Sequence, residues 1–317
     1  MIAMTAAQQP TLYFIGVTTG QSSIMKVFPA WAQFLGLAGA QIKGIDFPVH
    51  AAPAAYREAV EFIKNDPLSL GALVTTHKID LFDACRDLFD EIDPHAALMG
   101  ETSCLSKRDG RLVCHAKDPI SSGLTLDAFL PPRHFETSGA EVFVMGAGGS
   151  CIAMTWHLMQ ASRGLDRPSR IIVADRDAAR LEEIARLHRL FNPQFAVQYR
   201  QVVDASDNDQ ILSELSPGAV VINATGLGKD APGSPLSSKA IFPQRGIVWE
   251  LNYRGDLVFL EQARHQQEAR QLQVEDGWNY FIHGWTQVIA EVFDIAIAPS
   301  GEQFDALSQI AARFSQR

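Results

Sequence analysis

Two hydrophobic periods alternate along the first ninety residues of the chain. Short continuous apolar runs, typical of buried strands, are separated by segments whose apolar residues recur every three or four positions, as on one face of a helix. The predicted strands are residues 11–17, 41–49 and 71–75, and the predicted helices are residues 24–37, 54–65 and 79–89. Strands that alternate with helices favour a mostly parallel sheet with helices on both faces.

A hairpin and a second alternation follow. Arg108-Asp109-Gly110 is a turn signal between predicted strands 102–105 and 111–115. A polar loop over 118–122 then leads into a connecting helix over 123–130. Further strands are predicted at 142–145, 170–174, 197–203, 219–223 and 247–251, and helices at 152–159, 178–190, 258–270, 284–297 and 304–314.

Composition and charge restrict the class of protein. The chain has 317 residues, 47% of them hydrophobic and 20% charged, and its formal net charge is −9. An acidic chain argues against a nucleic-acid-binding surface. The N-terminal residues lack a signal-peptide pattern, no apolar run is long enough for a bilayer, and the four cysteines form no C-x-x-C pair. We therefore expect a cytoplasmic protein with reduced thiols and with neither a membrane nor a nucleic acid as a partner.

A glycine turn stands between a predicted strand and a predicted helix near the middle of the chain. Its residues are Gly146, Ala147, Gly148 and Gly149. Strand, glycine turn and helix together present backbone N–H groups and a helix N-terminus to a pyrophosphate. We therefore predict a dinucleotide site here, and no metal site, because the histidines show no ligand-like spacing.

Two later segments bear on the same site. Asp175 ends the next predicted strand, where an acid usually accepts hydrogen bonds from ribose hydroxyls and would repel a 2′-phosphate. Arg176 and Arg180 would instead clamp that phosphate. We favour NAD and leave NADP open. Asn223-Ala224-Thr225 follows another strand, at the edge of the sheet where the cofactor lies.

The order of these motifs resembles the shikimate/quinate dehydrogenase family nearly from end to end. The matching segments are Gly16 with Ser22, 71–78 (GALVTTHK), 109–112 followed by Asp118, 146–149 (GAGG), 223–225 (NAT), Tyr253 and 276–277 (DG). The resemblance implies two α/β domains: a substrate-binding and catalytic domain over 1–123, and a Rossmann-like, doubly wound NAD(P)-binding domain over 124–257. It also implies that C-terminal helices over 258–317 return to the first domain.

The resemblance further implies the chemistry. Lys78 and Asp118 would face the nicotinamide, with the Lys78 ammonium donating a proton to the alkoxide that forms when a ketone is reduced. The implied substrate residues are Ser22, Thr75, Thr102, Tyr253 and Gly284. Gly277 joins the cofactor residues.

Several positions depart from the family pattern. Ile24, Met25, Thr102, Ala116, Lys117 and Gly284 stand where the family has substrate-loop, asparagine, N-T and glutamine residues. Because a site loses discrimination when its polar partner is removed, the chemistry is retained while the substrate is open. Shikimate or quinate leads among polar cyclic hydroxy acids, and another hydroxy compound is the alternative.

Three questions stay open at this stage. Lys117 is a surface lysine or a replacement carboxylate binder, and His77 is a structural histidine or a proton relay. A non-catalytic sensor of dinucleotide and metabolite is a rival function. A homodimer is one assembly that the sequence allows.

Overall fold

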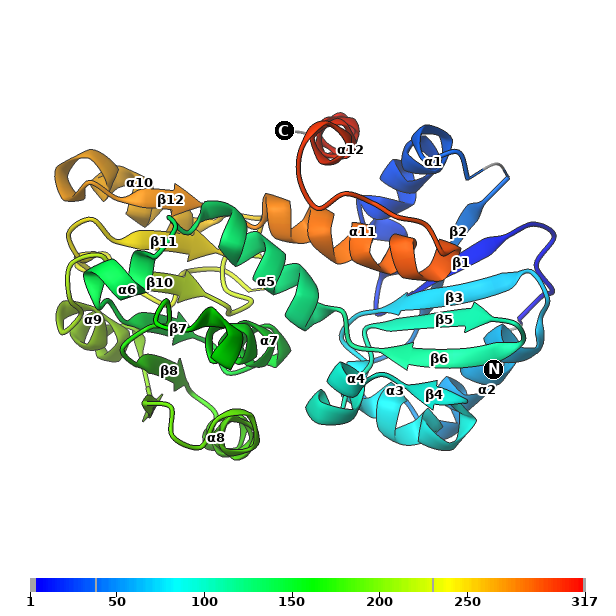
Figure 1. The fold of residues 1–317 in the computed structure, drawn as a ribbon, viewed down its shortest axis with the longest axis horizontal. Helices are drawn as coiled ribbons and strands as arrows, with labels where there is room; N and C mark the ends of the chain where they lie inside the picture. The colour runs from blue at the N-terminus through cyan, green and yellow to red at the C-terminus, as the bar shows by residue number, and fades with distance from the viewer. Residues whose placement is uncertain (1–3, 38, 230, 316–317) are drawn as a thin grey trace. The chain divides into compact units, whose positions relative to one another are not determined.

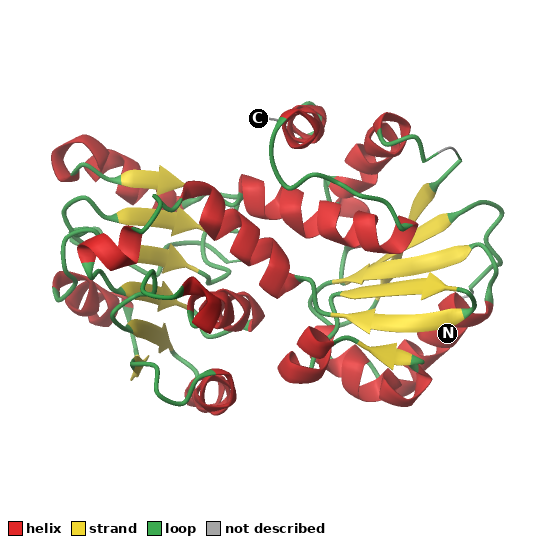
Figure 2. Ribbon diagram, viewed as in Figure 1, coloured by secondary structure: helices red, strands yellow, loops and turns green. Residues whose placement is uncertain are grey.

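The computed structural model describes residues 4–37, 39–229 and 231–315, and the chain divides into two compact units (Figures 1 and 2). Unit 1 consists of Met1–Lys117 and Ile282–Arg317, and unit 2 of Asp118–Phe281. Both are α/β, as predicted. The predicted domains met at residues 123 and 257, whereas the helices that begin at Asp118 and at Val258 both belong to unit 2.

Unit 1 contains one mixed sheet with the strand order β2-β1-β3-β5-β6-β4. Its strands are β1 (Thr11–Gly16), β2 (Gln41–Asp46), β3 (Ser69–Val74), β4 (Glu91–Ile92), β5 (Cys104–Arg108) and β6 (Arg111–His115). Only β5 runs antiparallel to its neighbours. The carboxyl ends of β1, β3 and β6 therefore lie at the same edge of the sheet as the start of β5.

The helices of unit 1 are α1 (Ile24–Phe34), α2 (Pro53–Asn65), α3 (Lys78–Cys85), α4 (Pro94–Met99), α12 (Glu302–Ala312) and the C-terminal part of α11 (Trp278–Phe293), with short turns η1 (Thr19–Gln21) and η2 (Arg86–Leu88). Helices α1, α2, α3 and α12 begin close to their predicted limits, whereas α4 was not predicted and α11 begins six residues before its predicted start. The apolar face of α1 is buried, and the indole N–H of Trp31 donates to the carbonyl of Leu307 at 2.8 Å. Of the predicted returning helices, α12 therefore packs on α1 within unit 1.

Unit 2 contains a fully parallel sheet with the order β12-β11-β10-β7-β8-β9, the doubly wound order of a Rossmann-like domain. Its strands are β7 (Val142–Met145), β8 (Ile171–Asp175), β9 (Val197–Gln201), β10 (Val220–Asn223), β11 (Ile247–Glu250) and β12 (Gln273–Glu275). Alternate residues of β7 and β10 enter two separate apolar clusters, Val142 and Val220 in one, Phe143 and Val221 in the other. Burial on both faces explains why these strands read as continuous apolar runs.

Helices cover both faces of this second sheet. They are α5 (Asp118–Phe129), α6 (His134–Ser138), α7 (Gly149–Leu158), α8 (Ala178–Phe191), α9 (Ala205–Ser213), α10 (Val258–Arg270) and the first turn of α11, with a short turn η3 (Ala161–Arg163). The prediction of a polar loop over 118–122 was wrong, because α5 already begins at Asp118. The hydroxyls of Ser121 and Ser122 donate to the Asp118 carbonyl at 3.3 and 2.7 Å, so these polar residues are satisfied within the helix.

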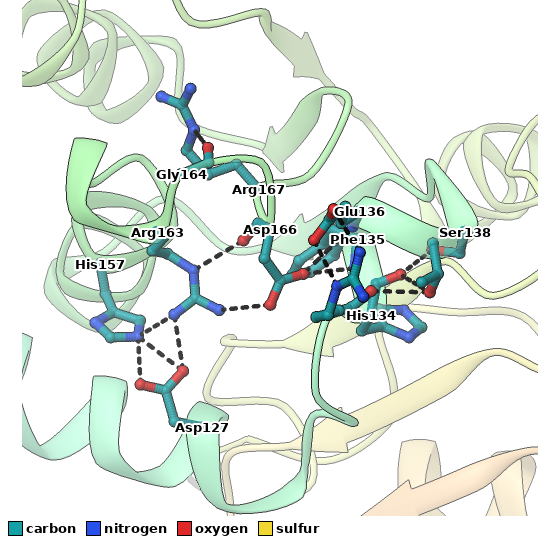
Figure 3. Close-up of polar contacts among 12 residues, drawn as sticks. Asp127, His134, Phe135, Glu136, Ser138, His157, Arg163, Gly164, Asp166 and Arg167 are labelled. Carbon is teal, nitrogen blue, oxygen red and sulfur yellow. Dashed lines mark hydrogen bonds and ion pairs between the residues drawn. The ribbon is translucent and has the colours of Figure 1, made fainter.

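An ionic cluster holds α5 against α7 (Figure 3). The carboxylate of Asp127 on α5 pairs with Arg163 at 2.8 Å and with His157 on α7 at 3.1 Å. Burial would raise the pKa of Asp127, but hydrogen bonds from His157 and Arg163 outweigh burial and lower it. Gly123 permits this packing, since a Cβ there would lie 2.5 Å from Nδ1 of His157.

All four cysteine side chains are buried and reduced. Cys85, Cys104 and Cys114 lie in unit 1, and Cys151 lies in unit 2. Burial raises the pKa of each thiol, to about 12 for Cys85 and Cys114. Within the described ranges, none of the helices combines the length and the apolar character that crossing a bilayer requires.

We predict that Gly71→Ala destabilises unit 1. Gly71 has φ +154°, and a Cβ there would lie 2.1 Å from the carbonyl oxygen of Leu105 on the neighbouring strand. Separating β3 from β5 to relieve this clash should lower the free energy of unfolding by about 2 kcal/mol. Denaturant titration measures this loss, and Gly20→Ala, where a Cβ meets nothing within 4 Å, is the control. Equal stability of the two variants would contradict the prediction.

Candidate functional site

The glycine turn of unit 2 lies where β7 passes into α7. Gly146 has φ +102°, and a Cβ there would lie 2.8 Å from the carbonyl oxygen of Ala224. Gly148 is the N-cap of α7, and no side chain caps the helix there. The first N–H groups of α7 are therefore not taken up by a capping side chain, and dinucleotide binding by Gly146–Gly149 stays a prediction.

Asp175 ties the end of β8 to this turn. One carboxylate oxygen of Asp175 accepts the N–H of Ala147 at 2.7 Å, and the other accepts the N–H of Asp177 at 2.9 Å. Each oxygen of an ionised carboxylate has a further lone pair. The same side chain can therefore shape the turn and accept a ribose hydroxyl.

A cavity of about 240 Å³ opens between the turn and the neighbouring loops of unit 2. It is lined by Met145, Gly146, Gly148, Ala174, Asp175, Arg176, Arg180, Val202, Asp204, Ala205, Asn208, Ala224, Thr225, Gly226, Leu227 and Pro235. Arg176 and Arg180 are exposed, while Asn208 is buried and its side-chain oxygen has no partner. Glycine backbone, carboxylates and guanidinium groups thus surround one hollow, a combination that suits a ribose with its phosphate.

A buried polar network supports the part of the cavity lining that follows β10. Asn223 is fully buried, and its side-chain N–H donates to Glu250 at 2.7 Å while its side-chain oxygen accepts the N–H and the hydroxyl of Thr225 at 3.0 and 2.6 Å. Ala224 and Thr225 line the cavity, whereas Asn223 is absent from the lining and contacts it through Thr225; the cofactor role of this segment stays a prediction.

Glu250 was missed by the sequence reasoning, and it is also fully buried. Burial raises the pKa of Glu250 to about 7, against the opposing effect of hydrogen bonds from Asn252 and Asn223. The sequence feature that could have indicated its role is that Glu250 is a single acid within the otherwise apolar run 247–251.

The predicted substrate residues of unit 1 gather at one edge of its sheet. Ser22 follows β1 and Thr75 follows β3, while Thr102 precedes the antiparallel β5. The N–H of Thr102 donates to the carbonyl of Lys78 at 3.1 Å, and the N–H of Thr75 donates to Ile15 at 2.9 Å. Unit 1 therefore brings Thr75, Lys78 and Thr102 together. The Thr102 hydroxyl is buried and donates to backbone carbonyls.

The remaining predicted residues are divided between the units. Asp118 is the first residue of unit 2, which also contains Tyr253 and Gly277, whereas Gly284 lies in unit 1. Lys78 and Asp118 thus belong to different units, and their pairing stays a prediction. A Cβ on Gly277 would lie 1.9 Å from the carbonyl oxygen of Leu251, so close backbone packing is one reason for a glycine there.

Tyr253 and Gly284 have contrasting surroundings. The ring of Tyr253 packs on that of Phe281, with ring centroids 4.5 Å apart, and meets Trp278 edge-on. Gly284 lies on α11 with open space around the position of a Cβ. Gly284 therefore contributes no side chain, and the space next to it on the helix surface is unfilled by neighbouring protein atoms.

Lys117 and His77 both turn inward. The Lys117 ammonium pairs with Glu291 at 2.6 Å, and only 12% of its side chain is exposed, so the interpretation as a surface lysine is wrong. Burial would raise the pKa of Glu291, but the Lys117 hydrogen bond and nearby His115 lower it. His77 is fully buried, with Nδ1 at 2.9 Å from the Tyr56 hydroxyl. The described residues contain no cluster of His, Cys, Asp or Glu arranged to hold a metal ion.

No family model matches the chain. A curated protein named shikimate dehydrogenase (NADP(+)), from Lactococcus lactis subsp. cremoris (strain MG1363), is 26% identical over 178 residues, which cover 56% of this chain and 59% of that protein. The chain spans about three fifths of the length of the curated relatives it matches.

Solved structures match over nearly the whole chain. Ligand-free 5-ketofructose reductase of Gluconobacter sp. strain CHM43 shares 17% identity with a TM-score of 0.68, covering 96% of this chain and 99% of that one. Quinate dehydrogenase from Corynebacterium glutamicum in complex with NAD shares 20% identity with a TM-score of 0.70, covering 95% and 98%. The fold is thus the two-domain α/β fold with a Rossmann-like second domain. The predicted resemblance is confirmed as a similarity: the chain resembles curated shikimate dehydrogenases in sequence over part of its length, and it shares its fold with solved shikimate and quinate dehydrogenases.

We predict that Glu291→Gln destabilises the protein in a pH-dependent way. The variant leaves the largely buried Lys117 ammonium without its carboxylate, which should cost about 2 kcal/mol of unfolding free energy at neutral pH. Because the pKa of folded Glu291 is lowered, the stability it contributes is present above its unfolded pKa and is lost as pH falls through the folded value.

Denaturant titration across the acidic range measures this loss. The difference between the parent and Glu291→Gln should shrink on acidification. Glu183→Gln, in an exposed pair with Arg186, is the control and should change little. A pH-independent difference would contradict the assignment.

Proposed function

We propose that the protein is an NAD(P)-dependent oxidoreductase that interconverts a secondary alcohol and a ketone on a polar substrate by hydride transfer. The observation that carries the proposal is the cavity of unit 2, where the uncapped N-terminus of α7, the Gly146–Gly149 turn and Asp175 converge. Unit 1 adds a lysine among hydroxyl side chains at the corresponding edge of its own sheet.

The residues of the cavity fit a dinucleotide. Backbone N–H groups of the turn and of α7 would hold the pyrophosphate, and Asp175 would accept a ribose hydroxyl. The bound nicotinamide supplies or accepts the hydride. Asn223, Ala224, Thr225 and Gly277 are proposed to complete this side of the site, Asn223 through its hold on Thr225.

We propose NAD as the preferred form of the cofactor. Two cations, Arg176 and Arg180, line the cavity together with two carboxylates, Asp175 and Asp204. This balanced charge offers no excess positive potential to the dianionic 2′-phosphate of NADP. Related proteins include one named for NADP(+) and one solved with NAD, so the choice rests on the charges of this chain.

We propose Lys78 as the proton donor and Asp118 as the group that orients it. The Lys78 ammonium would stabilise the developing alkoxide and protonate it during reduction. In the oxidation direction the same amine must accept the proton. Ser22, Thr75, Thr102, Tyr253 and Gly284 are proposed to surround the substrate.

The substrate class is proposed from the side chains that unit 1 presents. Ile24 is fully buried on α1, and the Lys117 ammonium is held by Glu291, so neither offers a new binding group for a carboxylate. Shikimate and quinate are the first candidates among cyclic hydroxy acids. An uncharged hydroxy ketone is the second, since a 5-ketofructose reductase shares the fold.

We predict that Lys78→Ala abolishes turnover and leaves dinucleotide affinity nearly unchanged, because Lys78 lies in unit 1 and the cavity lies in unit 2. Turnover is followed by the absorbance of the reduced nicotinamide with shikimate, quinate and 5-ketofructose, and affinity by calorimetry. Lys43→Ala, on β2, is the control and should keep both properties. Equal loss of turnover and affinity would count against the role of Lys78. Tight dinucleotide binding without turnover in the parent would favour a sensor.

We predict that Asp175→Ser weakens NAD binding by about tenfold, the value of one lost charge-assisted hydrogen bond. The loss includes the hydrogen bond from Ala147 that fixes the glycine turn. Calorimetry with NAD and with NADP measures the change. A parent protein that already prefers NADP would refute our interpretation of Asp175.

A further inference from the structure

The carboxylate of Glu250 is the centre of a hydrogen-bond network at the carboxyl end of β11. One oxygen accepts the side-chain N–H of Asn223 at 2.7 Å. The other accepts the backbone N–H and the side-chain N–H of Asn252, at 2.8 and 2.7 Å. Glu250 is fully buried, so these donors take the place of water around the carboxylate.

The direction of this network is fixed by groups that can only donate. The backbone N–H of Thr225 donates to Asn223, so the side-chain oxygen of Asn223 must face Thr225 and its side-chain N–H must face Glu250. The backbone N–H of Asn252 can also only donate, so the other oxygen of Glu250 must be an acceptor. An ionised carboxylate, which only accepts, satisfies every donor.

Both arms of the network end on the loop that walls the dinucleotide cavity. Through Asn223, Glu250 fixes the N–H and hydroxyl of Thr225. Through Asn252, it fixes the carbonyls of Thr225 and Leu227, at 3.2 and 3.4 Å from the side-chain N–H. Residues 224–227 line the cavity together with Gly146 and Gly148. One buried carboxylate thereby sets the shape of a wall that it does not itself form.

We infer that Glu250 is a positioning residue, which holds the 224–227 loop in the shape that receives the dinucleotide. The inference rests on the proposed function, because it gives a role toward the same cofactor. Glu250 is absent from the cavity lining, so it acts through Asn223, Asn252 and Thr225.

Protonation of Glu250 should weaken the network, because charge-assisted hydrogen bonds to a carboxylate are stronger than hydrogen bonds to a neutral carboxyl group. Burial raises the pKa of Glu250 to about 7, and the Lys229 ammonium on the adjoining loop opposes this rise. On the neighbouring strand β12, Glu275 accepts a hydrogen bond from Gln273, and after it Asp276 accepts one from Trp278. When Glu250 gains a proton, one of its oxygens becomes a hydroxyl, which accepts more weakly and needs an acceptor of its own, so the hydrogen bonds that hold Asn223 and Asn252 toward the loop weaken.

The experiment measures dinucleotide affinity by calorimetry, without turnover, on either side of neutral pH. The parent should bind more weakly as pH falls through the pKa of Glu250 near 7. Glu250→Gln presents an amide donor at all pH values, so its affinity should be about tenfold weaker above neutrality, the value of one hydrogen bond, and should lose the pH response. Glu250→Asp keeps an acceptor and should restore that response in part.

Two further variants separate positioning from general destabilisation. Thr225→Val cuts the opposite end of the network, so it should weaken binding while keeping the pH response. Glu275→Gln changes a carboxylate on β12 that lies outside the network, and it should bind as the parent does. Thermal unfolding of each variant shows whether it is folded. If Glu250→Gln does not fold, Thr225→Val still tests the network.

The outcomes distinguish this inference from the proposed function. A parent that binds neither NAD nor NADP overturns the proposed function. A parent that binds while Glu250→Gln binds equally well, with the same pH response, overturns the positioning role and leaves the proposed function intact. Parent-like binding by Thr225→Val also overturns it.

Discussion

In unit 2, the backbone of β7 and the loop after β10 pass each other at Gly146 too closely for any side chain. The N–H of Gly146 also donates to Ala174 on β8, and the N–H of Ala224 donates to Met145, so three strand ends are joined at one point. The turn, the start of α7 and the wall of the cavity take their positions from this crossing. Only a glycine adopts the required φ without strain and leaves the required space.

Glu250 is a buried carboxylate at the end of β11, in a sheet whose other buried residues are mostly apolar. Removing an ionised group from water is costly, and the cost is visible in the raised pKa of Glu250. The hydrogen bonds from Asn223 and Asn252 offset part of that cost, and the same two side chains also hydrogen-bond to the 224–227 loop and hold it in place. Apolar packing thus defines the strands, while a small polar network defines where their connecting loop lies.

Local pattern predicted much of the fold, because strands such as β1, β7 and β10 are buried apolar runs and helices such as α1 and α2 each bury one apolar face. It missed β4, β12, α4 and α6, which are too short to show a period, and it missed α9, whose clearest local signal is the capping box at Asp204. It also placed the start of α5 too late. The glycine turn and the cavity-lining Thr225 were predicted from strand–loop order, whereas the partnership of Lys117 with Glu291 joins residues far apart in sequence and has no local signal.

The distribution of the buried thiols makes the two units separately observable. A thiol whose pKa is raised by burial reacts only when its surroundings open, so its rate of alkylation reports a local unfolding equilibrium. Unit 2 carries one such thiol, Cys151, in the first turns of α7, and unit 1 carries the other three. The chain therefore contains its own reporters in each unit, with which local unfolding of unit 2 and of unit 1 can be timed separately in one sample.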